Sequence, residues 1–411
     1  MTHGGVTRPG NVRQMRGDEH IGARVASERK LRGLTQVQLA DQAHVSLSLL
    51  RKVEQGSKPA SSAFVSAVAR ALRVEWNSLT GQPYRVGDRR EDAVHNLVPD
   101  IRRELVAYRL PPEEDRPVPR LGDVRGEVAE VSRLRHRVDL LTLGTRLPDV
   151  LADLRTASHA YTGTDREHVM ALWAETYYAA RQFLHKLGYV DLASLVADRY
   201  EWAAAGSGDP LAVALGNVFR AGELDGSGDW RGARTVMAQA VDSVQPTDDP
   251  ATLSVYGFLH LMSAYMAAHA GDDAETWAHH REAEQTAHRL GTDRDDYRLA
   301  FGLTNVAIWG TALGVELMDG AEAVKRADHV RLTDATPPER VGHHFIDLAR
   351  GQLLYGDRAS ALRSLVTARR VAPQQTRYHP MARETVYALA RAERRSSDTL
   401  RGLAAWMGMQ D

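Results

Sequence analysis

Residues 34–56 read LTQVQLADQAHVSLSLLRKVEQG, a pattern of two short helices separated by a tight turn. Thr35 and Ser46 each precede a helical run, and their hydroxyl groups can accept hydrogen bonds from the free N–H groups of a first helical turn. Gly56 follows the second run and can adopt the left-handed conformation that ends helices. The sequence therefore predicts a helix-turn-helix at this place.

The second predicted helix, from Leu47 to about Gln55, has two different faces. Leu50 and Val53 share an apolar face with Val45, which lies just before the helix. The opposite face is cationic and hydrogen-bonding, as expected of a helix that reads the major groove of DNA. It consists of Leu47, Ser48, Arg51, Lys52 and Gln55.

A longer pattern extends this motif over residues 21–82. Its residues are Arg29, Gly33-Leu34-Thr35-Gln36, Leu39-Ala40, Val45-Ser46, Leu50-x-x-Val53-Glu54-x-Gly56 and Ala69-x-Ala71-Leu72-x-Val74-x-Trp76-x-x-Leu79-x-Gly81. On these residues the segment resembles the DNA-binding domain of the lambda-repressor/Cro (XRE-type) regulators, which has five helices. Two positions depart from the resemblance, because His44 stands where the turn usually has glycine and Glu28 where the first helix usually has leucine.

The resemblance implies a role for each matching residue. Arg29 and Glu54 would form an internal ion pair, and Gln36 would contact a phosphate and brace the recognition helix. Arginine bound to guanine is the commonest specific contact in the major groove, whereas phosphate contacts position the protein. For Ser48, Arg51 and Lys52 a solvated surface is the alternative interpretation. The residues expected to face DNA are Gln36, Leu47, Ser48, Arg51, Lys52, Lys58, Ser61 and Ser62, the last three at the DNA backbone.

Charge is distributed unevenly along the chain. Residues 1–90 contain 15 Lys and Arg against 7 Asp and Glu, whereas all 411 residues together carry a net charge of −1. This asymmetry favours a nucleic-acid contact at the N-terminal end. Residues 1–18 show no periodicity and predict a flexible basic arm, which could enter a minor groove or be a plain disordered tail.

Composition and motifs argue against several classes of protein. The chain has no cysteine, which excludes a disulfide scaffold and thiolate metal sites. No run approaches the roughly 18 apolar residues of a membrane helix, and the N-terminus lacks the apolar stretch of a secretory signal, so a cytoplasmic protein is expected. No P-loop, G-x-S-x-G or HExxH motif occurs, so we expect neither an enzyme nor a cofactor. The adjacent pairs His279-His280 and His343-His344 would point about 100° apart on a helix, so no metal is expected either.

The remainder of the chain predicts helical repeats. Residues 83–120 hold six of the sixteen prolines and predict a linker with one helix near 92–110. From 121 to 411 glycines punctuate helical runs, as where Gly228 is followed by Ala233 and Gly356 by Ala361. This pattern resembles degenerate tetratricopeptide repeats, which implies antiparallel helix pairs stacked with a concave face. The expected fold is all-α, with a five-helix domain at 19–82 followed by an α-solenoid at 121–411.

Several positions of the repeats would line the concave face. Aromatic, amide and imidazole groups there suit a peptide or a small polar ligand, and packing between repeats is the alternative for each of them. The candidates are Tyr178, Gln182, His185, Tyr265, His269, Asn305, His343 and Arg350.

The combination resembles bacterial peptide-sensing regulators, in which a ligand in the repeats changes the placement of the DNA-binding domains. We therefore expect a transcriptional regulator that binds a double-stranded DNA operator as a homodimer, because one small module buries too little surface for tight specific binding. A peptide or small-molecule ligand would modulate operator binding. The alternative is a DNA-tethered adaptor or antitoxin-like protein whose repeats bind a partner protein.

Overall fold

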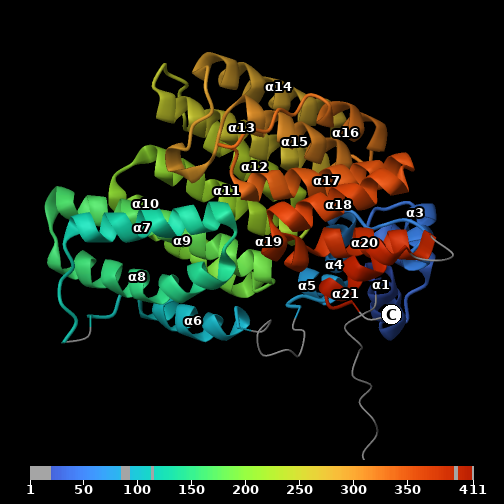
Figure 1. Cartoon of the computed structure of the whole chain (residues 1–411), viewed down its shortest axis with the longest axis horizontal. Helices are drawn as coiled ribbons and strands as arrows, with labels where there is room; N and C mark the ends of the chain where they lie inside the picture. Colours follow the sequence, from blue (N-terminus) through green and yellow to red (C-terminus); the bar gives the residue numbers. More distant parts are fainter. Residues whose placement is uncertain (1–19, 85–92, 113–114, 393–396, 410–411) are drawn as a thin grey trace, which may run out of the picture.

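The computed structural model describes residues 20–84, 93–112, 115–392 and 397–409, so the predicted arm at 1–18 lies outside the described residues. Within these ranges the chain is helical and contains no β-strand, apart from one isolated bridge between Arg294 and Phe301. A small N-terminal domain lies against the C-terminal helices of a larger stack of helix pairs (Figure 1). The predicted all-α class is confirmed.

The N-terminal domain has five helices, as predicted. Thr35 and Gln38 form a reciprocal capping box at the start of the second helix, and the Ser46 hydroxyl accepts from the N–H of Leu49 in the third. His44 adopts φ 52°, so the turn keeps the left-handed conformation that glycine would supply. The helices are α1 (Ile21–Leu31), α2 (Gln36–Gln42), α3 (Leu47–Glu54), α4 (Ser62–Leu72) and α5 (Trp76–Thr80).

The repeats are built from consecutive helices that pack on one another in pairs. At four of the turns within a pair, an aspartate caps the second helix and accepts from its N3 backbone N–H; one of these is Asp229, after Gly228. The pairs are α9 (Gly163–Leu187) with α10 (Val190–Ser207), α11 (Pro210–Gly226) with α12 (Trp230–Asp242), α13 (Pro250–His269) with α14 (Asp273–Leu290), α15 (Leu303–Glu316) with α16 (Gly320–Ala327), and α17 (Pro338–Tyr355) with α18 (Arg358–Val371).

Further helices close both ends of this stack. At the first end lie η1 (His95–Leu97), α6 (Val98–Ala107), α7 (Leu121–Arg137) and α8 (Leu140–Ala160), and at the other α19 (Pro373–Tyr378), α20 (Pro380–Ala392) and α21 (Asp398–Trp406). A short η2 (Asp296–Arg298) lies in the loop before α15. None of the helices in the described ranges is long and apolar enough to cross a membrane.

Part of the predicted linker at 83–120 is packed instead of extended. Ile101 and Leu105 on α6 are fully buried, and α6 packs on α8 and α10. The His95 ring hydrogen-bonds the backbone oxygen of Tyr84 and the hydroxyl of Tyr189. His95 and the inner face of α6 therefore belong to the core of the repeats, and α6 is the one helix that the sequence predicts within this segment.

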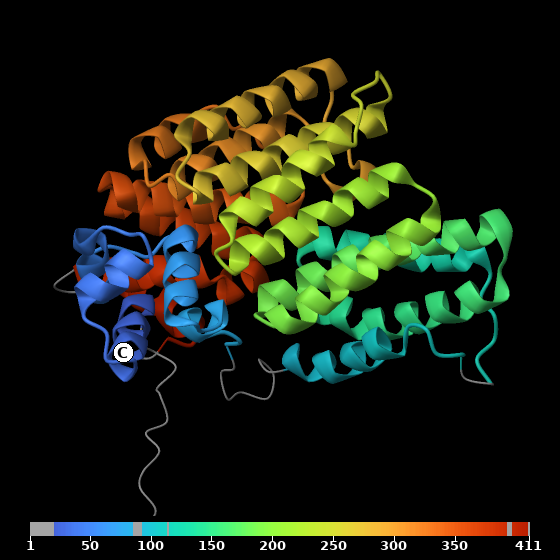
Figure 2. The ribbon, with the colours of Figure 1, turned by 180° about the vertical axis from the view of Figure 1, so that it is seen from behind.

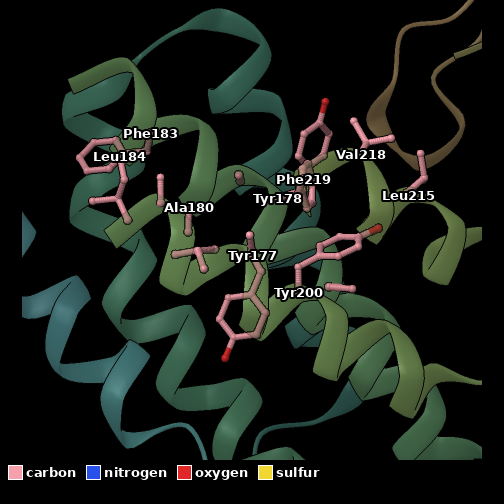
Figure 3. Packing of buried hydrophobic residues seen from close by; sticks show 14 of the residues in the cluster. Tyr177, Tyr178, Ala180, Phe183, Leu184, Tyr200, Leu215, Val218 and Phe219 are labelled. Atoms are coloured by element: carbon pink, nitrogen blue, oxygen red, sulfur yellow. The ribbon is translucent and has the colours of Figure 1, made fainter. Parts of the chain in front are cut away.

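An aromatic core holds the first repeat pairs together. The ring of Phe219 lies 5.5 Å from that of Tyr178 and 4.7 Å from that of Tyr200, and Figure 3 shows these side chains packed among the neighbouring helices. Tyr178 also receives the guanidinium of Arg135 on its face at 4.6 Å. Tyr178 is 6% exposed and lines a small hollow with Tyr200 and Phe219, so the packing interpretation describes its position better than an open groove.

Candidate nucleic-acid interface and polar clusters of the repeats

The outward face of α3 carries the polar side chains that the sequence predicted for it. Leu50 and Val53 are completely buried in the core of the small domain, which fixes the rotation of the helix. Ser48, Arg51 and Lys52 are exposed as a result, and Leu47 is half-buried at the edge. The helix lies at the outer end of the molecule, away from the centre of the repeats (Figure 1).

An ion pair fixes α3 against the rest of its domain. The Arg29 guanidinium donates to both carboxylate oxygens of Glu54, at 2.7 and 2.9 Å. Gln36 donates its side-chain amide to the same carboxylate at 2.7 Å, and Arg29 also donates to the backbone oxygen of Leu34. The hydrogen bond with Glu54 raises the pKa of Arg29. Side chains from α1, α2 and α3 thus meet at one buried carboxylate.

The segment directly after α3 differs from the expectation of an open DNA-contacting surface. Ser61 is only 7% exposed, and its hydroxyl caps α4 by accepting from the N–H of Phe64. The Ser62 hydroxyl donates to Glu316 of α15 at 3.4 Å. Lys58 is half-buried, and burial together with the nearby Lys52 lowers its pKa. In this arrangement Ser61 and Ser62 face the repeats, so neither is placed to contact DNA.

The main polar contact between the two parts of the chain is made by Glu384 on α20. Its carboxylate is 5% exposed and accepts from the backbone N–H of Ile21 at 3.2 Å and of Ala60 at 3.4 Å. Burial raises the pKa of Glu384, partly offset by these two hydrogen bonds. The guanidinium of Arg391, further along α20, lies against Gly56 and contacts the His20 ring.

Two more hydrogen bonds and one apolar contact join the small domain to the repeats. Arg70 on α4 donates to the backbone oxygen of Gly228 at 2.9 Å, and Gln82 donates to that of Tyr378 at 3.1 Å. Trp230 at the start of α12 packs against the apolar core of the small domain. Seen from behind, the domain lies against the red C-terminal helices (Figure 2). Sequence reasoning missed Glu384, Glu316 and Arg391, because they lie more than 250 residues from the groups they contact.

Three of the predicted groove residues meet in what we call the first polar cluster. His269 contacts Asp225 at 2.7 Å and Glu316 at 3.4 Å, and the Tyr265 ring lies 4.1 Å from the imidazole. Burial alone would lower the pKa of His269, but the two carboxylates raise it to about 10. Arg350 completes the cluster, since it bonds Glu316 and Asp347 at 2.8 Å each. The cluster consists of Asp225, Tyr265, His269, Glu316, Asp347 and Arg350.

A second polar cluster surrounds Glu339 on α17. The Lys186 ammonium lies 3.1 Å from this carboxylate and 3.3 Å from the His343 ring, and Arg135 donates to Glu339 at 3.0 Å. Burial and the neighbouring cations lower the pKa of His343 well below its usual range. His343 and His379 are partly exposed, whereas the side chain of Arg340 is 11% exposed, so the cluster borders the surface on one side. The cluster consists of Arg135, Lys186, Glu339, Arg340, His343, Gln375 and His379.

The remaining groove candidates, Gln182, His185 and Asn305, belong to neither cluster. His185 is exposed next to the second cluster, and Gln182 is half-buried on α9. Asn305 is 3% exposed and donates its amide to the backbone oxygen of Leu299. The loop before α15 covers Asn305, so its side chain holds that loop in place and does not face a groove.

One comparison with known proteins, a match to a family model, agrees with the geometry of the small domain. Residues 20–76 match a family model described as a helix-turn-helix domain. Among curated proteins, none matches this sequence significantly. The crystal structure of BtubC (BKLC) from P. vanneervenii is similar at 17% sequence identity, and the match covers 67% of this chain and 96% of that one. Its TM-score of 0.37 is too low to support an inference about fold or function. The family match and the arrangement of α2 and α3 identify residues 20–76 as a helix-turn-helix domain, a class of DNA-binding module.

Proposed function

We propose that this protein is a sequence-specific DNA-binding transcriptional regulator and not an enzyme. The observation that carries the proposal is the outward face of α3, where Ser48, Arg51 and Lys52 are exposed within a domain that matches the helix-turn-helix family. The buried Leu50 and Val53 hold this face away from the domain core. A rigid helix with exposed donors is what major-groove recognition requires.

Each exposed side chain has a role in the proposed complex. Arg51 would pair with a guanine edge, and Ser48 would bond a base or a nearby phosphate. Leu47 has no hydrogen-bonding group and would contact a thymine methyl. Lys52 and Gln36 would bond the DNA backbone, which positions the helix without selecting sequence. Two copies of the chain would bind an inverted repeat, because a single module of this size buries little DNA surface.

We propose further that the repeats bind a ligand that modulates operator binding. The second polar cluster supports a ligand with a negative group, such as the carboxylate of a peptide or of a small molecule. Three cations, Arg135, Lys186 and Arg340, have side chains at most 11% exposed, and Glu339 is the carboxylate they share. Buried charge without full compensation is unfavourable, so an anion arriving from the half-exposed side would be stabilised.

The test begins with selection of bound sequences from a random DNA library by the full-length protein. The affinity of the selected operator is then compared with that of unrelated DNA by fluorescence anisotropy, for wild type and for Arg51→Ala. Loss of one bidentate base contact weakens operator binding by about 1–3 kcal/mol, with a much smaller effect on unrelated DNA. Arg231→Ala is the matched control, because Arg231 is an exposed arginine on α12.

Two outcomes would contradict parts of this proposal. If the wild-type protein selects no sequence, the regulator function is wrong, and a partner protein that co-purifies in stoichiometric amount would favour the adaptor. If Arg51→Ala weakens binding to both DNAs equally, Arg51 is a backbone contact and carries no sequence information.

A further inference from the structure

We infer that the repeats of this chain compete with DNA for the small domain, by placing the carboxylates of Glu384 and Glu316 on the segment that follows α3. The arrangement described above is then a closed form, and operator binding requires the small domain to separate from α15 and α20. This inference rests on the proposed function, because it concerns how the same DNA-binding surface is regulated.

The contact at Glu384 uses backbone N–H groups of the small domain as its donors. Both oxygens of this carboxylate accept from backbone N–H groups, one at the start of α1 and one just before α4. Backbone N–H groups near the start of a helix are also what proteins use to hold a phosphate. A carboxylate of the same chain therefore occupies donors that could otherwise face the DNA backbone.

The segment that Glu384 and Glu316 contact lies next to α3 in the chain. Residues 57–62 follow directly after α3, and the major groove that would receive α3 is only about 12 Å wide. The phosphates that border the groove must pass close to the residues at the ends of the inserted helix. Arg391 lies against Gly56 at this point, and Ser62 is bonded to Glu316. The phosphates would meet two like-charged carboxylates there, and the exposed Arg391 guanidinium beside Gly56 offsets only part of that repulsion.

The contact between the small domain and the repeats has two features that would allow its release. Among the described residues of the repeats, Met381 and Trp230 are the two that join the apolar core of the small domain. A hollow no larger than a water molecule lies between the two parts, and its lining includes Pro59, Ala60, Ser61, Arg350, Met381 and Glu384. Burial disfavours the ionised form of Glu384, and separation would return this carboxylate to water. Both observations fit a contact that can be broken.

Glu316 connects the contact with the small domain to the first polar cluster. Glu316 accepts from Ser62 with the same oxygen that bonds Arg350 at 2.8 Å, and its other oxygen faces His269. Arg350 lies close enough to His379 of the second polar cluster to lower the pKa of that ring, after burial, so a ligand in the second cluster that shifts Arg350 would change the position of the Glu316 carboxylate. The network thus gives a ligand in the repeats a direct connection to the DNA-binding domain, and differential binding to the two forms would shift their populations.

The experiment measures operator affinity and hydrogen exchange on the full-length chain. Glu384→Gln keeps the size of the side chain but replaces one acceptor oxygen by an NH2 group, so one of the two backbone N–H groups loses its partner. We expect operator affinity to rise about fivefold or more, and exchange in residues 20–25 and 56–62 to become faster. Glu284→Gln is the control, because Glu284 is an exposed glutamate on α14, and it leaves both quantities unchanged.

A second variant tests the same inference in the opposite direction. The chain has no cysteine, so Ser62→Cys together with Glu316→Cys can be joined selectively by a short bismaleimide linker. Linking the two domains abolishes operator binding relative to the same variant before the reaction. Unchanged affinity in Glu384→Gln, or full binding by the linked protein, would overturn the inference. If no form of the protein selects an operator, the proposed function has failed instead.

Discussion

The two sides of the small domain differ in what their polar groups contact. On the outward side of α3, Ser48, Arg51 and Lys52 face solvent. On the side that includes the start of α1 and the segment after α3, polar groups are bonded to Glu384 and Glu316 of the repeats. This single domain of about sixty residues therefore has one polar surface exposed to solvent and one that is covered by the repeats. On the proposed function, the first surface would recognise DNA and the second would control that recognition.

The strongest test of this comparison removes the carboxylate that fixes α3. Glu54→Ala leaves the buried Arg29 and the amide of Gln36 without their common acceptor, and breaking a buried ion pair in this way costs about 3–5 kcal/mol. Hydrogen exchange in α1, α2 and α3 measures the loss. Glu28→Ala is the control, since Glu28 pairs with Arg32 at the surface, where such pairs contribute about 0–1 kcal/mol. Equal losses in the two variants would mean that the buried pair does not hold the recognition helix.

A second prediction concerns pH and the first polar cluster. The pKa of His269 is about 10 in the folded protein, raised by Asp225 on α11 and Glu316 on α15, against 6.5 for an ordinary histidine. The stabilisation is therefore complete below about pH 6.5 and is lost as the pH rises towards 10, by up to about 1.4 kcal/mol for each pH unit. Arg350 on α17 also belongs to the cluster and stays charged throughout this range.

Thermal unfolding of wild type and His269→Gln between pH 7 and pH 10 tests this directly. The wild type loses stability over the interval, whereas His269→Gln changes less, because the group that titrates has been removed. Parallel curves for the two proteins would show that His269 is neutral in the folded state. The folded protein keeps His269 protonated until about pH 10, so operator affinity is not expected to change through His269 over this interval.

The helix-turn-helix could be predicted because its determinants are local. Thr35 and Ser46 cap helices within three residues, and the apolar spacing of Leu50 and Val53 defines the buried face of α3. The contact between Glu384 and Ile21 joins residues 363 positions apart, and no local pattern encodes such a meeting. The prediction of the helix-turn-helix therefore treats Ser61 and Ser62 as if that domain stood alone.

The groove residues show a different limit of sequence reasoning. Tyr265, His269 and Arg350 meet in one polar cluster, but His269 and Arg350 are as buried as Tyr178 and Asn305, so the groove that the sequence predicts for all of them stays a prediction. A shift of one residue rotates a helical side chain by about 100°, so an uncertain alignment of degenerate repeats exchanges a groove position for a core position. The periodicity predicts the helices well but leaves their rotation in the stack open.

A smaller effect is expected at Lys52, for which a DNA contact and a solvated surface were equally good interpretations. As a phosphate contact, Lys52 would contribute equally to all DNA sequences, so Lys52→Ala weakens operator and unrelated DNA by the same factor. The slope of log affinity against log salt concentration falls by about 1. Anisotropy titrations at several salt concentrations measure both quantities. An unchanged slope would assign Lys52 to the solvated surface and restrict the DNA contact to the first turns of α3.

The smallest effect is expected at Arg391, and it shows which group dominates the closed form. The guanidinium is exposed where it contacts His20, and exposed polar contacts of this kind contribute little to stability. Burial and the neighbouring cations of Arg391 and Arg24 lower the pKa of His20 to about 4, so the ring is neutral at pH 7 and forms no ion pair. Arg391→Ala therefore changes operator affinity less than twofold, well below the change expected for Glu384→Gln. An increase as large as that of Glu384→Gln would show that the bulk of α20 beside Gly56 keeps DNA away, and that the two carboxylates only position the helix.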